Sequence, residues 1–246
     1  MKPKEIVEKR LGISPDYQYK AMRKSFWLKR NWHKNKFDVI KAVCGFKRKM
    51  DVLDLGTGSG NFELLYSRSV NHIYGIDYND EALLFLKNKL KSRNINNVTL
   101  ECSDMRKLSA KLASKKYDLI VSIDTIEHIT SKDGELVVSW AKKRLSKEGK
   151  LVIITPNYQS IWRFLEPVLD ILSFTPNMGR HQHLSKYSVN SMTAMLKKTG
   201  FKINSATSFN LFSFIFPQKV STYLLKLEMR FLKVFGPLMA IEAVRK

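Results

Sequence analysis

The chain contains 246 residues, of which 44% are hydrophobic and 11% are aromatic. A chain of this length forms one domain with additions or two small domains, and this composition excludes an intrinsically disordered protein. Its 43 Lys and Arg residues against 22 Asp and Glu residues give a net charge of +21. Such a surface is expected to attract nucleic acid or anionic lipid headgroups, unless a high lysine content is a general trait of the lineage.

Two cysteines and the first residues of the chain bear on its compartment. Cys44 and Cys102 lie far apart and lack the spacing of a metal site, so we expect a reducing compartment and no disulfide framework. The N-terminal sequence MKPKEIVEKR is charged and lacks the apolar stretch of a signal peptide. No apolar run reaches the ~18 residues of a membrane-spanning helix. These features predict a cytoplasmic location.

The N-terminal segment, 1–48, is basic and has a helical pattern. Within 31–43, apolar residues recur at roughly helical spacing, which predicts an amphipathic helix. These residues are Trp32, Phe37, Ile40 and Val43.

Beyond residue 48, apolar runs alternate with helical patterns. Strands are predicted over 49–55, 71–77, 97–104, 117–124 and 149–155, and helices over 61–69, 79–93 and 135–145, with Asn79 or Asp80 as the N-cap of the second helix. This alternation predicts a parallel sheet with helices on both faces. Later come a helix over 188–200, a strand over 201–208 and a last, hairpin strand over 236–246.

The sequence VLDLGTGSGNF, 52–62, places three alternate glycines after the first strand: Gly56, Gly58 and Gly60. A dinucleotide loop requires G-x-G-x-x-G, and the position of its third glycine is Asn61 here. Asp54, at the strand end, would repel a pyrophosphate and attract an ammonium or a sulfonium. The loop therefore favours a ligand with a positive charge and no phosphate.

Two further acids follow the next two strands. Asp77 can accept both hydroxyls of a ribose, and Asp104 can accept from an adenine amine while Met105 packs on the ring. Ligands of open α/β sheets bind at the carboxyl ends of the strands, where all these acids lie. A nucleoside with a charged amino-acid tail fits them, which describes S-adenosylmethionine.

Five segments in order, VLDLGTGSGNF, YGIDYND, ECSDM, YDLIVSIDTIEHI and GKLVIITPN, resemble the successive motifs of class I S-adenosylmethionine-dependent methyltransferases. The resemblance covers roughly residues 45–208. It implies a Rossmann-like α/β fold with a seven-stranded, mostly parallel sheet, helices on both faces, a helical N-terminal cap and an apolar insert after strand 5. It implies cofactor contacts from Asp54, Gly56, Thr57, Gly58, Gly60, Asp77, Tyr78, Asp104, Met105 and Asp124.

We accordingly expect a single methyltransferase domain over 1–246. Its parts are the cap (1–48), the cofactor-binding core (49–157), the acceptor-site insert (158–187) and the C-terminal helices and hairpin strands (188–246).

The segment SIDTIEHIT, 122–130, supplies the predicted catalytic residues, His128 and Asp124. A histidine titrates near working pH, so His128 could accept a proton from a phenolic acceptor; alternatively, it packs the following loop. IEHI is similar to small-molecule, quinone and lipid methyltransferases, including ubiquinone-pathway O-methyltransferases. An acid-x-x-Glu-His pattern has been linked with a divalent metal in that group, but Asp124 reaches less far than a glutamate, so we expect no metal.

The insert and the segment after it concern the acceptor. The insert is too apolar for a solvated loop, and Trp162, His181 and His183 are candidate substrate contacts. The two histidines resemble an H-x-H-x-x-S segment that often follows this insert in the same group, and a structural role is the alternative. No [DNS]-P-P-[YFW] motif follows the fourth strand, which counts against amino methylation of nucleic-acid bases.

The segment 218–236 predicts a helix with an apolar face and a basic face. The apolar face contains Val220, Leu224, Leu227, Phe231 and Val234, and the basic face contains Lys219, Lys226, Arg230 and Lys233. This pattern is typical of an interfacial membrane helix, while packing on the sheet and a dimer interface are alternatives.

We therefore predict an S-adenosylmethionine-dependent methyltransferase. Its acceptor is expected to be a hydrophobic small molecule, such as a quinone, a prenylated ring or a lipid, at an anionic membrane surface. This hypothesis adds a peripheral position at the inner face of the cell membrane to the cytoplasmic location. The alternative is an rRNA or tRNA methyltransferase that binds nucleic acid through its basic surface. The acceptor atom and the oligomeric state stay open.

Overall fold

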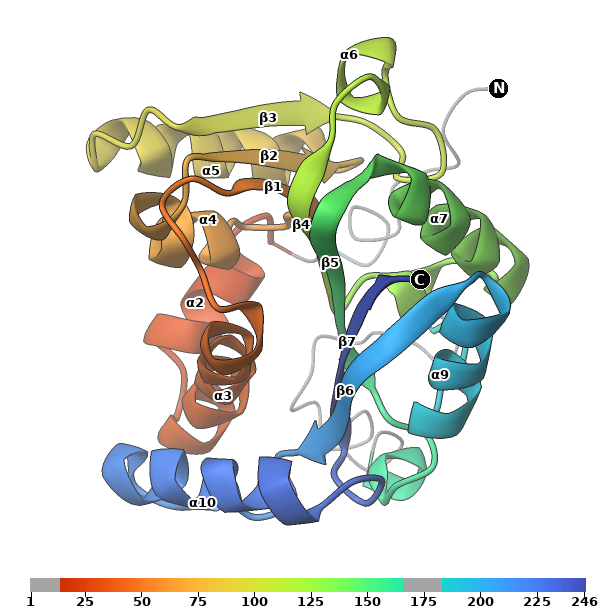
Figure 1. Ribbon diagram of the computed structural model, residues 1–246. Coiled ribbons are helices and arrows are strands. Elements are labelled where there is room, and N and C mark those ends of the chain that lie inside the picture. The colour runs from red at the N-terminus through yellow and green to blue at the C-terminus, as the bar shows by residue number, and fades with distance from the viewer. Residues whose placement is uncertain (1–13, 166–182) are drawn as a thin grey trace.

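A computed structural model describes residues 14–165 and 183–246. Its centre is a seven-stranded sheet of order β3-β2-β1-β4-β5-β7-β6, in which β7 is antiparallel to both of its neighbours (Figure 1). The strands are β1 Asp51–Leu55, β2 His72–Asp77, β3 Val98–Cys102, β4 Tyr117–Ile123, β5 Leu145–Pro156, β6 Phe201–Phe209 and β7 Leu238–Arg245. The predicted seven-stranded, mostly parallel sheet is confirmed.

Helices cover both faces of the sheet and one of its ends (Figure 1). One face carries α3, α4 and α5, the other carries α7 and α9, and α10 lies across the end beneath α3 and β6. The helices are α2 Tyr17–Arg23, α3 Trp27–Cys44, α4 Asn61–Tyr66, α5 Asp80–Ser92, α6 Ala110–Ala113, α7 Ser131–Arg144, α9 Val189–Lys198 and α10 Gln218–Phe231, with 3-10 turns η1 Ser67–Ser69, η2 Ile126–His128 and η3 Ser213–Ile215. Within the described ranges, no helix is long and apolar enough to cross a membrane.

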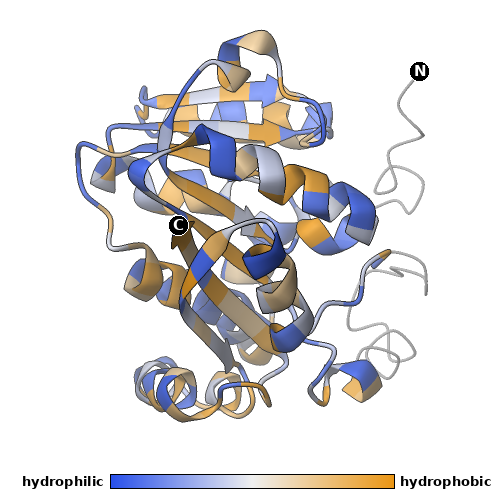
Figure 2. Cartoon of the chain, turned by 45° about the vertical axis from the view of Figure 1, so that its right-hand side comes forward, coloured by the Kyte–Doolittle hydropathy of each residue, from blue (hydrophilic) through white to orange (hydrophobic). Residues whose placement is uncertain are grey.

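Two hydrophobic clusters form because successive side chains of a strand point to opposite faces of the sheet. Val52 of β1 packs toward α3 and α4, whereas Leu53 packs toward α7 and α9. Both are fully buried, as are Leu119 and Ile120 of β4. Burial on both faces explains the nearly unbroken apolar runs of these central strands, which Figure 2 shows in orange.

The N-terminal cap is an integral layer of the fold. Val39, Ile40 and Cys44 of α3 are completely buried against the sheet. The Tyr66 hydroxyl of α4 donates to the Phe37 carbonyl at 2.6 Å. The cap therefore lies beside the glycine loop, although the sequence indicated only a helix.

Several element boundaries differ from the predictions. Helix α7 begins four residues earlier than predicted, because Thr130 caps it by accepting from the Asp133 N–H. Strand β5 extends back to Leu145, where the helix was predicted to end, because Leu145 still pairs with Tyr117 across a register shift. Asn79, one of the two proposed N-caps, caps α5.

Helix α10 ends at Phe231 rather than at residue 236. The Leu232 carbonyl accepts from the Ser208 N–H and hydroxyl of β6, which draws the chain out of the helix. Val234 consequently packs beside the core and is not part of the helical apolar face. His181 and the insert residues 166–182 lie outside the described residues.

Candidate active site

The loop between β1 and α4 depends on its three glycines. Gly56, Gly58 and Gly60 have φ angles of 85°, 52° and 77°, which side chains rarely adopt. A Cβ on Gly56 would lie 2.3 Å from the Thr125 side chain, and a Cβ on Gly60 would lie 2.1 Å from Leu86. The loop backbone is therefore held in a close turn that only glycine permits.

Asp77 holds this loop to the end of β2. One carboxylate oxygen accepts from the Gly58 N–H at 2.7 Å, and the other accepts from the Asn79 N–H at 2.8 Å. A carboxylate oxygen has two lone pairs and can accept more than one hydrogen bond. The carboxylate lies at the sheet edge expected of it, and its contact with a ribose stays a prediction.

A pair of buried acids lies beneath the loop. Asp54 is 1% exposed and Glu63 of α4 is fully buried. Burial raises the pKa of Asp54 to about 7, and the nearby Asp77 charge adds to the rise. Burial and the Asp54 charge hold the pKa of Glu63 well above its usual value. Among the described residues, Asp54 Oδ1 and both Glu63 carboxyl oxygens have no hydrogen-bond partner.

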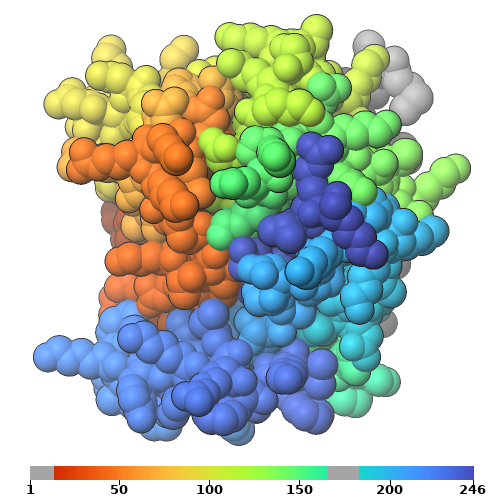
Figure 3. All heavy atoms as spheres, in the orientation of Figure 1, coloured from red at the N-terminus to blue at the C-terminus, as the bar shows by residue number. Residues whose placement is uncertain are grey.

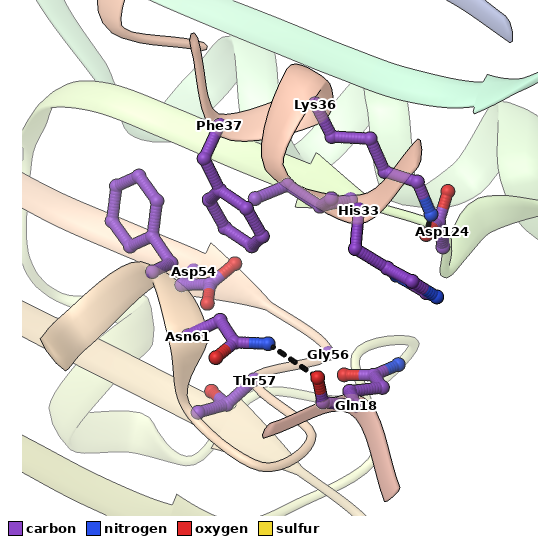
Figure 4. A pocket seen from close by; sticks show the side chains of 11 residues that line it. Gln18, His33, Lys36, Phe37, Asp54, Gly56, Thr57, Asn61 and Asp124 are labelled. Atoms are coloured by element: carbon purple, nitrogen blue, oxygen red, sulfur yellow. Dashed lines mark hydrogen bonds and ion pairs between the residues drawn. The ribbon is translucent and has the colours of Figure 1, made fainter. Parts of the chain in front are cut away.

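Helices α2 and α3 form the roof of a pocket over the loop (Figure 4). The Tyr19 N–H donates to the Ser59 hydroxyl at 2.8 Å, and the Asn61 amide donates to the Gln18 carbonyl at 3.0 Å. The lining residues are Gln18, His33, Lys36, Phe37, Asp54, Gly56, Thr57, Asn61, Phe62, Ile123 and Asp124. Sequence analysis missed the four from α2 and α3, because no motif connects the cap with the glycine loop.

Lys36 and Asp124 form an ion pair across this pocket. Lys36 is buried on α3, and Asp124 follows β4 with a φ of 50°, a left-handed conformation unusual for aspartate. Asp124 Oδ1 is buried and has no partner within the described chain. His33 lies beside the pair in Figure 4, and its burial and the Lys36 and Lys29 charges hold its pKa well below the usual value.

The predicted adenine contacts lie after β3. The Arg106 Nε donates to both Asp104 carboxylate oxygens at 2.9 Å, which holds the pKa of this carboxyl below its usual value. Met105 is partly buried, and its carbonyl accepts from the Trp140 indole at 3.1 Å. Tyr78 is exposed beside Asp77. The sheet brings these residues to the same edge as the loop, and their roles stay predictions.

A second polar cluster lies after β4 and β5. Glu127, His128 and His183 place one ligand atom each within 4.8 Å of one another, which suits a divalent cation. Burial raises the pKa of Glu127, whose carboxylate accepts from the Thr155 hydroxyl at 2.8 Å. The Tyr158 hydroxyl lies 2.6 Å from His183 Nδ1.

The structure brings His128 and His183 together as candidate site residues, but His33 rather than His128 lines the described pocket. Trp162 stacks on Trp32 of α3, with ring centroids 5.5 Å apart. Neither this aromatic pair nor the two histidines line the described pocket, and their roles as substrate contacts stay predictions.

The residues of the pocket suit S-adenosylmethionine in two respects. Gly56 lines the pocket with backbone atoms alone, because glycine has no side chain. Asp54 Oδ1 is buried, and the neighbouring group is another carboxyl, that of Glu63, so a cationic ligand would offset the cost of burying the Asp54 charge. Four of the predicted contacts line the pocket: Asp54, Gly56, Thr57 and Asp124.

Solved structures share this fold at low sequence identity. Magnesium protoporphyrin IX methyltransferase from Synechocystis PCC 6803, crystallised with bound SAH, aligns with a TM-score of 0.66 and 14% identity. The alignment covers 97% of this chain and 96% of that chain. The PH0226 protein from Pyrococcus horikoshii aligns with a TM-score of 0.66 and 16% identity, over 97% and 99% of the two chains. The fold is that of a class I S-adenosylmethionine-dependent methyltransferase.

A family model described as a methyltransferase domain matches residues 28–206, and the chain belongs to this family. Its cofactor is S-adenosylmethionine, and it is a methyltransferase enzyme.

Curated relatives match parts of the chain. A ribosomal protein L11 methyltransferase of Lactobacillus gasseri is 30% identical over 112 residues, which are 45% of this chain. A probable cobalt-precorrin-6B C(15)-methyltransferase (decarboxylating) of Methanococcus maripaludis is 27% identical over 172 residues, covering 65% of this chain and 91% of the relative. The chain spans only 33% and 23% of the length of the two Lactobacillus relatives that it matches.

Proposed function

We propose that this enzyme methylates a hydrophobic small molecule, such as a quinone, a prenylated ring or a lipid, presented at a membrane surface. The supporting observation is the aromatic group beside the pocket. Trp32 stacks on Trp162 and meets Phe214 edge-on at a centroid distance of 5.0 Å. These three rings come from α3, from the segment after β5 and from η3. They form a packed aromatic cluster next to the turn of α3 that carries His33, and Trp162 is 8% exposed.

Two of the similar proteins are named for small-molecule substrates, magnesium protoporphyrin IX and cobalt-precorrin-6B. The +21 net charge instead favours RNA as the alternative acceptor. Aromatic rings also stack on bases, so the acceptor must be identified by experiment.

S-adenosylmethionine supplies an electrophilic methyl group on a sulfonium when it is bound. Asp54, once ionised, would stabilise the positive charge of the cofactor from beneath the loop. The ion pair with Lys36 fixes the Asp124 carboxylate at the end of β4. The pocket groups thereby orient donor and acceptor, which is the main requirement for methyl transfer.

A protonated acceptor, such as a phenol or an enol, also needs a base. His128 was the sequence candidate, and His33 is a second one because its lowered pKa keeps the imidazole neutral at neutral pH. A neutral imidazole nitrogen can accept the acceptor proton. We expect His33→Asn or His128→Asn to lower kcat about a hundredfold or more, depending on which one is the base. If both substitutions change kcat only slightly and to the same extent, neither histidine is the base.

The acceptor is tested by incubating the protein with radiolabelled S-adenosylmethionine and cell extract. The products are separated into organic-soluble, nucleic-acid and protein fractions. We expect the label in the organic phase. Label confined to RNA would overturn the proposal in favour of the alternative, and label confined to protein would overturn both.

A further inference from the structure

Helix α10 has three faces rather than two. Ser221, Leu225 and Glu228 point inward, and Leu225 is 2% exposed. At 100° per residue, Val220, Tyr223, Leu227 and Phe231 form a separate stripe, which is exposed in the described part of the chain. Their exposed fractions reach 64% for Tyr223 and 67% for Phe231.

This stripe continues onto the segments that flank the helix. We call the whole surface the docking face, and its apolar residues are Phe212, Ile215, Phe216, Val220, Tyr223, Leu227, Phe231 and Phe235, all of them exposed. It lies at one end of the molecule, where α10 forms the lower edge in Figure 3. Exposed apolar side chains gathered on one helix and its flanking segments are typical of an interaction site.

Basic side chains border the docking face. Lys219, Lys226 and Arg230 are exposed and lie along one side of the apolar stripe. Lys233 follows the end of the helix. Glu228 is the only acidic residue between positions 210 and 237. It is buried, so the exposed part of this segment carries positive charge alone.

Glu228 also determines which side chains the docking face presents. Its carboxylate accepts from the backbone N–H groups of Asn210, Phe212 and Ser213 at 2.6 to 2.8 Å and from the Ser213 hydroxyl at 2.7 Å. These bonds hold η3 against α10 with Phe212, Ile215 and Phe216 exposed. The outward position of these side chains is therefore built into the fold.

We propose that the docking face binds an anionic lipid bilayer, with its apolar side chains in the headgroup region and its basic side chains on lipid phosphates. Aliphatic side chains beside aromatic ones match an acyl boundary, whereas Val220, Ile215 and Leu227 offer nothing to a nucleic acid. A two-fold dimer with antiparallel α10 helices would place the two basic rows on the same side, with no exposed acid in this segment to pair with them.

The docking face is connected to the pocket. The Asn31 amide of α3 donates to the Phe216 carbonyl at 2.7 Å, and Trp32 contacts Phe214. His33, the next residue of α3, lines the pocket. Docking of this face on a bilayer would bring the pocket close to the lipid. This link between docking and catalysis rests on the proposed function.

The test is co-sedimentation of the full chain with vesicles, without S-adenosylmethionine. We expect binding to vesicles of equal parts phosphatidylglycerol and phosphatidylethanolamine, and little binding to phosphatidylcholine alone. The double variant Tyr223→Ser/Phe231→Ser should bind about a hundredfold more weakly. The matched control Leu84→Ser/Leu136→Ser removes two apolar side chains that are 59% and 56% exposed on α5 and α7, and it should bind like the wild type.

Charge is tested in the same assay. Lys219→Gln/Lys226→Gln/Arg230→Gln should weaken binding by about a hundredfold. The control Lys87→Gln/Lys91→Gln/Lys143→Gln removes as many exposed charges elsewhere and should have a much smaller effect. Circular dichroism and thermal unfolding verify that each variant is folded.

Three results would overturn the inference: equal binding to neutral and anionic vesicles, equal losses in the variants and their controls, or an α10-dependent dimer that does not bind vesicles. Methyl transfer to a detergent-solubilised organic extract is measured separately. If the label fails to enter that extract while vesicle binding persists, the proposed function fails and the docking inference stands.

Discussion

The cofactor loop and the docking face both depart from the usual distribution of polar and apolar side chains, but in opposite ways. Beneath the loop, the fold buries the acids Asp54 and Glu63 next to each other, and Asp54 Oδ1 and both Glu63 carboxyl oxygens have no hydrogen-bond partner in the described chain. On the docking face, it exposes aromatic rings that could pack in a core. Each arrangement costs folding free energy, which a cationic ligand can offset beneath the loop and an apolar surface can offset on the docking face. Function in this protein is thus concentrated where the rule of apolar inside and polar outside is broken.

The largest effect is expected from a substitution that disrupts the glycine loop. Gly56→Val should abolish S-adenosylmethionine binding and lower the free energy of unfolding by about 3 kcal/mol, because the new side chain requires an unfavourable φ and collides with Thr125. Calorimetric titration and thermal unfolding measure both. Gly45→Ala is the control: its φ is also positive, at 53°, but its Cβ would meet only Lys150, at 3.9 Å. Loss of binding in the control would show that positive φ alone explains the result.

The next largest effect is expected when the Glu228 carboxylate, which supports the docking face, is removed. Glu228→Ala leaves three backbone N–H groups without their acceptor, so we expect a loss of about 3 kcal/mol in the free energy of unfolding. Vesicle binding should weaken as η3 loosens. Glu135→Ala, which removes an exposed ion pair with Lys198, should change stability by less than about 0.5 kcal/mol. A Glu228→Ala variant with wild-type stability and vesicle binding would remove the assigned role of this residue.

Asp54→Asn separates binding from stability at the loop. We expect the affinity for S-adenosylmethionine to fall about a hundredfold, because a charged partner becomes neutral. The ligand-free protein should be as stable as the wild type or more so, because a buried carboxyl beside Glu63 and Asp77 is removed. Asp51→Asn serves as a control at the other end of β1. A clear drop in ligand-free stability would contradict the idea that Asp54 is retained for the ligand.

The smallest expected effect is on pH dependence. Because burial raises the pKa of Asp54 to about 7, the carboxyl must lose a proton to bind a cation. Affinity should therefore fall by up to about tenfold per pH unit below pH 7, with proton release on binding. The ligand-free protein behaves oppositely: the folded state binds more protons between about pH 4 and 7, so this group's contribution to stability falls as pH rises through that window. Titrations in buffers of different ionisation enthalpy measure the released proton, and Asp54→Asn should remove it.

The apolar and polar patterning of the sequence was sufficient for the sheet, the glycine loop and the acids at its strand ends. Each of these features depends on residues close together along the chain. The alternation of strands and helices implies a parallel sheet, and parallel strands bring Asp54 and Asp77 to one edge. The G-x-G-x-G spacing likewise excludes a dinucleotide loop without reference to other segments.

Which side chains face the glycine loop and the acids at the strand ends is determined only by the tertiary structure. His33 and Lys36 reach the pocket because α3 packs over the loop, and Glu63 lies beside Asp54 because α4 turns back beneath the strand. The pattern of α10 revealed its apolar and basic faces but not which one faces the core. The hydrogen bonds that Glu228 accepts from Asn210, Phe212 and Ser213 accompany the inward orientation of a third face, which leaves the apolar stripe exposed. Periodicity describes the faces of one element, whereas the orientation of that element depends on contacts with segments distant in the chain.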